Sequence, residues 1–310
     1  MAVDSGNVGV GNAEATFDVV LASELVNQLP QASAALRNLT VIPMGTFTER
    51  IPVLSALPTA TFLTADQEVK PKSATAWKNV WLQAEEIAVI VPISENVIAD
   101  SSIDVVSRTT SLIVQEFGRV LDAAVFFGTG APSSFPTGGI FGAAQTQGSV
   151  IVPTGNIADD LNTMFGKVEQ LGYDVSNVFA DRALRTMLRG QKDGNGAPVY
   201  VPTEGDPNVG FIYGVPTSYP MGWDKTKGTA IAVDKSCAIL GLRSDVKTKI
   251  LTEANITGFG SLAEKDSIAI RATMRVAFCL ADPVAVLNET AKLPVSALGV
   301  ATGGGVPDEG

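Results

Sequence analysis

The sequence has no histidine and only two cysteines among its 310 residues. Without histidine, Ser-His-Asp and Cys-His catalysis, histidine-ligated zinc or haem, and a histidine pH switch are all excluded. Cys237 and Cys279 are far apart in the chain, which excludes a disulfide framework and CxxC metal or redox chemistry. A single bridge between them is the alternative, but we expect two buried thiols that pack as small apolar side chains.

Charged residues are also scarce. They make up 17% of the chain, against about 25% in a typical soluble protein. Hydrophobic residues make up 45%, which indicates extensive burial, including burial between subunits, rather than disorder. The net charge is −10 and no basic stripe is visible, which argues against dedicated nucleic-acid binding. At about 150 residues per domain, the length suggests about two domains, or one domain with large excursions.

Long apolar runs are missing as well. None approaches the ~18 residues of a membrane span, and the first residues have neither the basic nor the apolar region of a secretion signal. We therefore expect the protein to be made and kept in a cytoplasm, unless a larger assembly carries it out.

The first half of the chain predicts an uncovered arm, a hairpin and a long helix. Residues 1–16 have no core of their own, and short helices are expected at 17–29 and 32–39. The runs at 41–63 and 80–94 are extended, and the polar, proline-containing stretch between them predicts a long hairpin arm that lies on something else.

The strongest pattern is helical, from Ile103 to Phe126, with Ser94 expected to cap a short helix before it. Val106, Ile113, Phe117 and Leu121 fall on one face of the long helix and should meet a sheet. Beyond a Gly/Pro loop, we expect a helix at 159–172, a strand at 175–180, a helix at 181–188 capped by its first residue, and then mostly short strands. The end, from 299, reads as a Gly-rich tail.

Patterns that could carry chemistry are weak. The loop GTGAPSSFPTGG lacks the lysine of a phosphate-binding loop and follows a helix, so a chain reversal is expected; residues 194–196 are also read as a turn. Glu85 and Glu86 are neighbours on a strand and point to opposite faces, unlike a hydrolytic carboxylate pair. A Mg²⁺ or Ca²⁺ site made of carboxylates alone stays open, without calcium-loop spacing. Trp77 and Trp81 could stack on bases, but burial against a neighbouring subunit is the preferred reading.

The order of these features resembles the major capsid proteins of tailed bacteriophages of the Hong Kong 97 type. An aliphatic strand leads to Ser94 and a short helix, then a "DS" pair and the long helix, followed by "D-A-x-x-x-G-x-G" and "P-x-G-I" motifs. The positions that fit are Ser94, Asp100, Ser101, Asp122, Ala123, Gly128, Gly130, Pro136, Gly139 and Ile140. The later segments YGVPTSYPMG and DSIAIRATMRVAFCLADPVAVLN fit more loosely, and the resemblance spans about residues 50–290.

The resemblance implies an α+β fold with a long spine helix, an extended β-hairpin arm, and peripheral and axial domains. The expected parts are an N-terminal arm (1–45), the extended hairpin loop (46–92), a peripheral domain with the spine helix (93–154), an axial domain (155–250), return strands (251–298) and a flexible tail (299–310). The hairpin arm would contact a neighbouring subunit through Asp66, Glu68, Lys70, Lys72, Trp77 and Lys78.

It further implies a structural protein, not an enzyme, that forms pentamers and hexamers in an icosahedral shell around double-stranded DNA, without cofactors or metals. A separate scaffolding protein, a portal and a decoration protein are the expected partners. One branch of the family welds its shell by a lysine–asparagine bond with help from a glutamate. Lys70, Lys72 and Lys78 are candidate lysines, but Asp266 and Thr273 stand roughly where the asparagine and glutamate would be, so we expect no weld.

Two other readings stay open at this stage. An encapsulin-type nanocompartment would share the fold but hold protein cargo, and it would be expected to start with a helix rather than a Gly/Ser/Asn arm. A hydrolase that uses carboxylates alone would be active as a monomer. Electron microscopy of the purified protein, with a test for enclosed nucleic acid, would distinguish these readings.

Overall fold

The computed structural model describes residues 32–56, 60, 62, 70, 72, 73, 76–102, 104–191, 209–281 and 292–300. The structure does not describe the helix expected at 17–29, the turn at 194–196, residues 282–288 at the end of the loosely fitting late segment, or Asp66 and Glu68 of the hairpin arm. No helix in the described part is long and apolar enough to cross a membrane.

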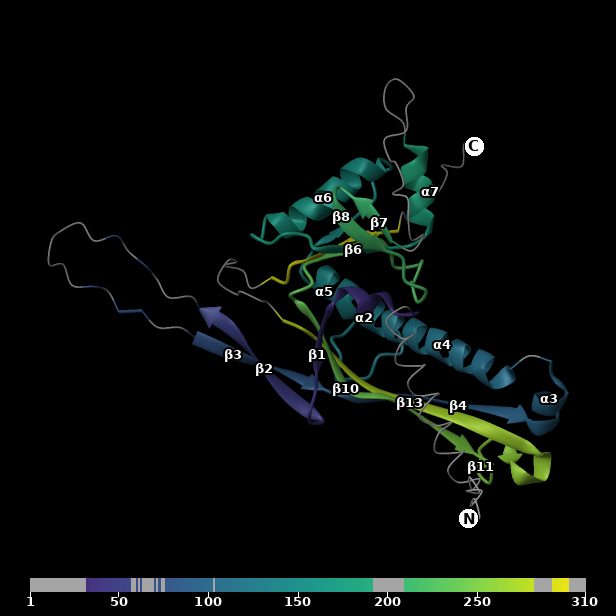
Figure 1. The fold of residues 1–310 in the computed structure, drawn as a ribbon. Coiled ribbons are helices and arrows are strands. Elements are labelled where there is room, and N and C mark those ends of the chain that lie inside the picture. The colour runs from purple at the N-terminus through teal and green to yellow at the C-terminus, as the bar shows by residue number, and fades with distance from the viewer. Residues whose placement is uncertain are drawn as a thin grey trace, which may run out of the picture.

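The described helices and strands form two larger sheets with helices packed on them, plus two separate two-stranded sheets (Figure 1). The helices are α2 (Ala34–Asn38), α3 (Glu95–Asp100), α4 (Val105–Phe127), α5 (Gly139–Thr146), α6 (Ile157–Glu169) and α7 (Ala183–Gly190), with a 3-10 turn, η1 (Ala263–Lys265). The strands up to residue 218 are β1 (Thr40–Pro43), β2 (Thr48–Ala56), β3 (Ala76–Gln83), β4 (Glu85–Ser94), β5 (Val150–Ile151), β6 (Asn177–Ala180), β7 (Val209–Ile212) and β8 (Val215–Ser218). The later strands are β9 (Gly228–Val233), β10 (Ala238–Leu251), β11 (Asn255–Ile256), β12 (Gly260–Ser261), β13 (Ser267–Leu280) and β14 (Val295–Gly299).

The first sheet has the order β1-β10-β13-β4 and combines strands from the beginning and the end of the described chain. Its centre is the antiparallel pair β10–β13, and β4 pairs with β13 along its whole length, from Ser94 opposite Ser267 to Glu85 opposite Val276. Helix α4 lies along one face of this sheet (Figure 1). The long helix predicted from Ile103 to Phe126 is thereby confirmed as a packed element.

The second sheet has the order β5-β14-β9-β6-β8-β7. Helices α6 and α7 pack on it through a second core, in which Leu161, Met164 and Leu184 are fully buried. Helix α5 bridges towards the first core, since Ile140 and Phe141 belong to the same hydrophobic cluster as α4. The two layers therefore share apolar contacts at α4 and α5.

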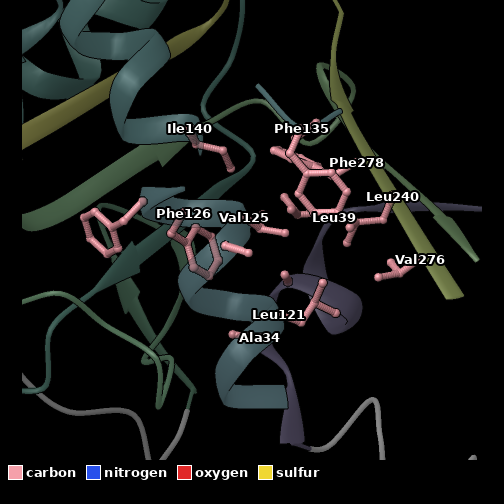
Figure 2. Packing of buried hydrophobic residues seen from close by; sticks show 14 of the residues in the cluster. Ala34, Leu39, Leu121, Val125, Phe126, Phe135, Ile140, Leu240, Val276 and Phe278 are labelled. Carbon is pink, nitrogen blue, oxygen red and sulfur yellow. The ribbon is translucent and has the colours of Figure 1, made fainter. Parts of the chain in front are cut away.

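The core between α4 and the first sheet explains the helical periodicity. Ile113, Phe117 and Leu121 are at most 4% exposed and pack with β10 and β13. In Figure 2, Leu121 and Val125 of α4 lie towards Leu240, Val276 and Phe278 of the strands, with Phe135 close to Phe278. The rings of Phe135 and Phe278 meet edge to face, with their centroids 5.9 Å apart. Val106 is half-buried at the edge of this cluster.

Several predicted boundaries were wrong because capping side chains set the helix starts. Asp104 accepts hydrogen bonds from the backbone N–H groups of Val106 and Ser107, so α4 begins at Val105. Asn156 caps α6, which begins at Ile157 rather than 159. Asp181 does not cap α7, whose N-cap position is Arg182. Ser94 does occupy the N-cap position of α3, but its side chain makes no capping hydrogen bond.

The hairpin also has a different second strand from the one predicted. Strand β2 pairs with β3, from Thr48 opposite Gln83 to Ala56 opposite Ala76. The aliphatic run that the sequence assigned to the hairpin is β4, and it belongs to the four-stranded sheet instead. Only Ala84 separates β3 from β4, and its side chain is buried against the sheet, so the chain passes directly from the hairpin into the core.

Candidate assembly interface

The hairpin β2–β3 projects away from the rest of the molecule, and its far end has no described neighbour (Figure 1). Its base is fixed by Leu82, which is fully buried against Ile239, Ala277 and Cys279 on the first sheet. Beyond that base, Ile51, Val53 and Val80 are only half-buried. A two-stranded ribbon of this kind is marginal alone in water, so it needs a surface to lie on.

Two tryptophans stand on one face of this ribbon. Trp77 and Trp81 are four residues apart on β3, so both point to the same side, and they are 63% and 60% exposed. The guanidinium of Arg50, directly opposite Trp81, lies 5.3 Å from the centroid of its ring. Exposed tryptophans with an arginine are typical of the centre of a protein–protein interface.

The structure describes four of the six predicted arm residues. Lys70, Lys72, Trp77 and Lys78 are all exposed. The contacts predicted for them with a neighbouring subunit stay a prediction.

A second feature joins the N-terminal part of the chain to the spine helix. Asp122 of α4 is fully buried and its Oδ1 and Oδ2 atoms accept hydrogen bonds from the backbone N–H groups of Ala35 and Ala34, both at 3.0 Å. Ser33 adds a third, from its hydroxyl to Oδ1. The carboxylate thus caps α2 from another helix, because the first N–H groups of a helix have no partners within it.

Burial of Asp122 raises the pKa of its carboxyl to about 6, since desolvation of the charged form outweighs the hydrogen bonds from Ser33, Ala35 and Ala34. Gly118, one turn earlier on α4, permits the close approach: a Cβ atom there would lie 2.7 Å from the carbonyl carbon of Ala32. In the sequence, Asp122 stands out only as a motif position. The feature that could have indicated its buried role is an acidic residue within the apolar face of a predicted helix.

The glycines of the motif form the reversal between α4 and α5. Gly128 ends α4 at φ 64°, and a Cβ atom on it would lie 2.7 Å from the Cα of Gly138. Gly139 has φ 61°, and a Cβ atom there would lie 2.4 Å from the carbonyl oxygen of Val125. The loop is therefore a close backbone crossing rather than a phosphate site, and the predicted chain reversal is confirmed.

Among the described residues, no group of three or more His, Cys, Asp or Glu side chains could hold a metal ion. Glu86 is held by Arg275, with 2.9 Å between Oε2 and the nearer guanidinium nitrogen. Cys279 is a buried thiol outside any disulfide, and its burial raises its pKa to about 12; Cys237 is also a buried thiol. The two cysteines are thus buried thiols, as predicted.

An apolar cavity of about 500 Å³ lies between α6, α7 and the end of β14. Asp160 is the carboxylate in its lining, and both its oxygens already accept hydrogen bonds from the backbone N–H of Thr154. Among the described lining residues no second carboxylate faces it, so the paired-carboxylate arrangement of a glycoside hydrolase is not present in this cavity.

Comparisons with known proteins agree with this picture. The family model described as the phage capsid family matches residues 20–288. A solved chain from Microbacterium phage Oxtober96 is 40% identical, with a TM-score of 0.75 over 86% of this chain and 90% of that chain. One from Mycobacterium phage Bobi is 30% identical, with a TM-score of 0.73 over 86% and 90%.

More distant structures share the fold alone. The capsid of an empty GTA particle, computed with C5 symmetry, is 15% identical with a TM-score of 0.62 over 87% of this chain and 90% of that chain. No curated protein matches. Capsid proteins form shells of repeated subunits. The chain belongs to the phage capsid family, with the α+β fold of the Hong Kong 97 type, and is the major capsid protein of a tailed phage.

Proposed function

We propose that copies of this protein assemble into an icosahedral shell around double-stranded DNA, and that the hairpin of each copy lies over a neighbouring subunit. The observation that carries the proposal is the exposure of Trp77 and Trp81 on one face of a ribbon that has no described neighbour at its far end. A tryptophan side chain offers roughly 200 Å² of surface, so covering the exposed part of each contributes about 3 kcal/mol at 25 cal/mol/Å².

Two layers of the fold correspond to the two expected domains. We assign the four-stranded sheet with α3 and α4 to the peripheral domain, and the six-stranded sheet with α6 and α7 to the axial domain. Strand β10 falls within the range expected for the axial domain. Because it pairs with β13 in the four-stranded sheet, we assign it to the peripheral domain instead. The extended hairpin, Thr48–Gln83, is then an outgrowth of the peripheral domain.

The role is structural, and the interior contents are enclosed rather than bound by sequence. The net charge of −10 supports this, because a strongly negative subunit repels phosphate backbones. Scaffolding, portal and decoration proteins are proposed as separate chains, and production in the host cytoplasm is proposed with them.

Replacing both hairpin tryptophans tests the proposal. The variant Trp77→Ser with Trp81→Ser should fold, since neither side chain is buried, but should yield few or no shells in electron micrographs and gradient sedimentation. Met187→Ser, which alters an exposed apolar residue on α7, is the matched control and should assemble normally. Deletion of Thr64 to Thr75 should give the same loss of shells.

Normal shells from both the double variant and the deletion would overturn the proposal. The contents of wild-type shells provide a second test. Double-stranded DNA inside particles from infected cells supports the proposed role, whereas particles that hold only protein would indicate a nanocompartment.

A further inference from the structure

We infer that the face of the four-stranded sheet that points away from α4 binds the acidic N-terminal segment of the chain, residues 1–31. This basic face is defined by five cations on two strands: Arg243, Lys247 and Lys249 of β10, and Arg271 and Arg275 of β13. The segment can come from the same copy or from a neighbouring one, and only the second case rests on the proposed assembly.

Strand alternation puts these side chains on one face. Ala272, Met274 and Val276 of β13 are buried towards α4, so Arg271 and Arg275 point the other way and are exposed. The opposite strand follows the same register. Lys249 pairs with Arg271 and Lys247 with Thr273, so both lysines stand on the outer side.

The charge of this face is not balanced by the described residues. Glu86 of β4 pairs with Arg275, and no described carboxylate pairs with Lys247, Lys249 or Arg271. Arg243, Lys247, Arg275, Thr273 and Glu86 surround a polar cavity of about 360 Å³. Five cations and, among the side chains that the structure describes, one carboxylate thus gather on this face of a chain whose net charge is −10.

The N-terminal segment has the complementary charge. It carries four acids, Asp4, Glu14, Asp18 and Glu24, and no lysine or arginine. The hairpin stretch 57–75, by contrast, has two acids and two lysines and is neutral. Charge complementarity therefore selects the N-terminal segment over the hairpin as the occupant.

The segment is also long enough to reach the face. Residue 32 is located beside Gly118, on the α4 side of the sheet. Thirty-one residues in extended form span up to about 100 Å, so the segment can pass around the sheet edge or cross to a neighbour.

The apolar content of the face favours a peptide over DNA. Ile90 of β4 is directly opposite Arg271 and is 43% exposed among the cations. A peptide that carries Val8 and Val10 between its acids can cover this isoleucine, whereas a phosphate backbone cannot. The carboxylate of Glu86 on the same face also disfavours a polyanion of uniform charge.

Zero-length coupling with a carbodiimide tests the contact, because it joins a carboxylate to an amine only where the two touch. Purified shells should yield peptides in which Lys247 or Lys249 is linked to Asp4, Glu14, Asp18 or Glu24. Lys247→Gln with Lys249→Gln should abolish these links, while Lys225→Gln, at an exposed lysine in a turn, should leave them unchanged.

Shells that form normally but link the two lysines only to other carboxylates, or not at all, would overturn the inference without touching the proposed function. Links that form in empty shells and vanish in filled ones would assign the face to DNA and would equally overturn it.

A charge exchange gives an independent readout. Lys247→Glu with Lys249→Glu should lower shell yield several-fold in low salt, and the effect should shrink at high salt, where exposed charges are screened. Adding Glu14→Lys and Asp18→Lys to that variant should restore the yield. Absence of rescue, with shells formed by the wild type under the same conditions, would contradict the pairing.

Discussion

The hydroxyl of Ser33 donates a 2.7 Å hydrogen bond to Oδ1 of Asp122, and both side chains are completely buried. The two residues are 89 positions apart, so this contact ties the entry of the N-terminal segment to the middle of the spine helix. Ser33 also accepts a hydrogen bond from the N–H of Leu36, which makes it the N-cap of α2. One carboxylate therefore fixes both the capping residue and the helix that it caps.

The pH dependence of stability should report on this carboxyl. The pKa of Asp122 is about 6 in the folded protein and 3.8 in the unfolded chain, so between these values the folded state binds the additional proton. Its contribution to the free energy of unfolding is full below about pH 4 and is lost as pH rises through 6. The free energy of unfolding lost over this pH range is about 3 kcal/mol, because the pKa differs by roughly 2 units between the two states and each unit corresponds to about 1.36 kcal/mol.

The variant Asp122→Asn isolates that contribution, because the amide does not titrate. The difference in unfolding free energy, wild type minus variant, should fall from pH 4 to pH 7 in denaturant titrations of unassembled protein. A difference that rises over this range would mean that the three hydrogen bonds outweigh burial and that the folded pKa is depressed.

Truncation of Phe117 should be far more damaging than truncation of an exposed neighbour. Phe117 is 2% exposed in the middle of α4, so Phe117→Ala leaves a cavity that costs about 3–5 kcal/mol. The expected result is insoluble or unassembled protein. Arg108→Ala, on the exposed side of the same helix, should be mild. Soluble expression and shell yield of the two variants are the measurement, and equal yields would argue against the packing of this face.

Two glycines should respond to the same substitution with opposite signs. Gly139→Ala forces a side chain into a left-handed backbone and against the carbonyl oxygen of Val125, so it should destabilise by at least about 2 kcal/mol. Gly166 lies inside α6 with open space around it, and Gly166→Ala should stabilise by roughly 0.5–1 kcal/mol. Thermal unfolding compares them; a loss in both would indicate a general intolerance rather than the crossing at Gly139.

Mature shells should contain no covalent weld between a lysine and an asparagine. Asp266 is exposed in a left-handed turn, and Thr273 is half-buried on β13 between Lys247 and Ala88, so neither offers the amide or the catalytic carboxylate that such a bond needs. Boiling particles in detergent should give a single band at the monomer position on a gel. A ladder of larger bands would show that another pair of residues forms the bond.

Local periodicity was sufficient for α4 and insufficient for the hairpin. The apolar residues of α4 repeat at helical spacing because one side of it packs on a sheet within the same chain. Strand β3 was missed because Trp77 and Trp81 face outward, so the stretch lacks the usual alternation of buried and polar positions. The run at β4 has that alternation, so the sequence predicts it as the hairpin strand, whereas the alternation arises from pairing with β13 much later in the chain.

The buried Asp122 and the basic face both depend on contacts between distant parts of the chain, which the sequence alone does not predict. The acid at Asp122 is one of many carboxyl groups, and its role emerges only when α2 is brought to α4. The five cations of the basic face are spread over 33 positions, and strand register alone gathers them. No basic stripe is visible along the sequence, because the cations of this face come from two strands that are separated in the chain.

The positions of β13 and β14 have a consequence for synthesis. Each occupies an interior place in its sheet, with β13 between β10 and β4, and β14 between β5 and β9. A ribosome delivers both only after the elements that flank them, so neither sheet can close until nearly the whole described chain has emerged. Such long-range pairing slows folding and leaves strand edges exposed in the meantime. A chain broken off before residue 267 lacks an interior strand of each of the two sheets.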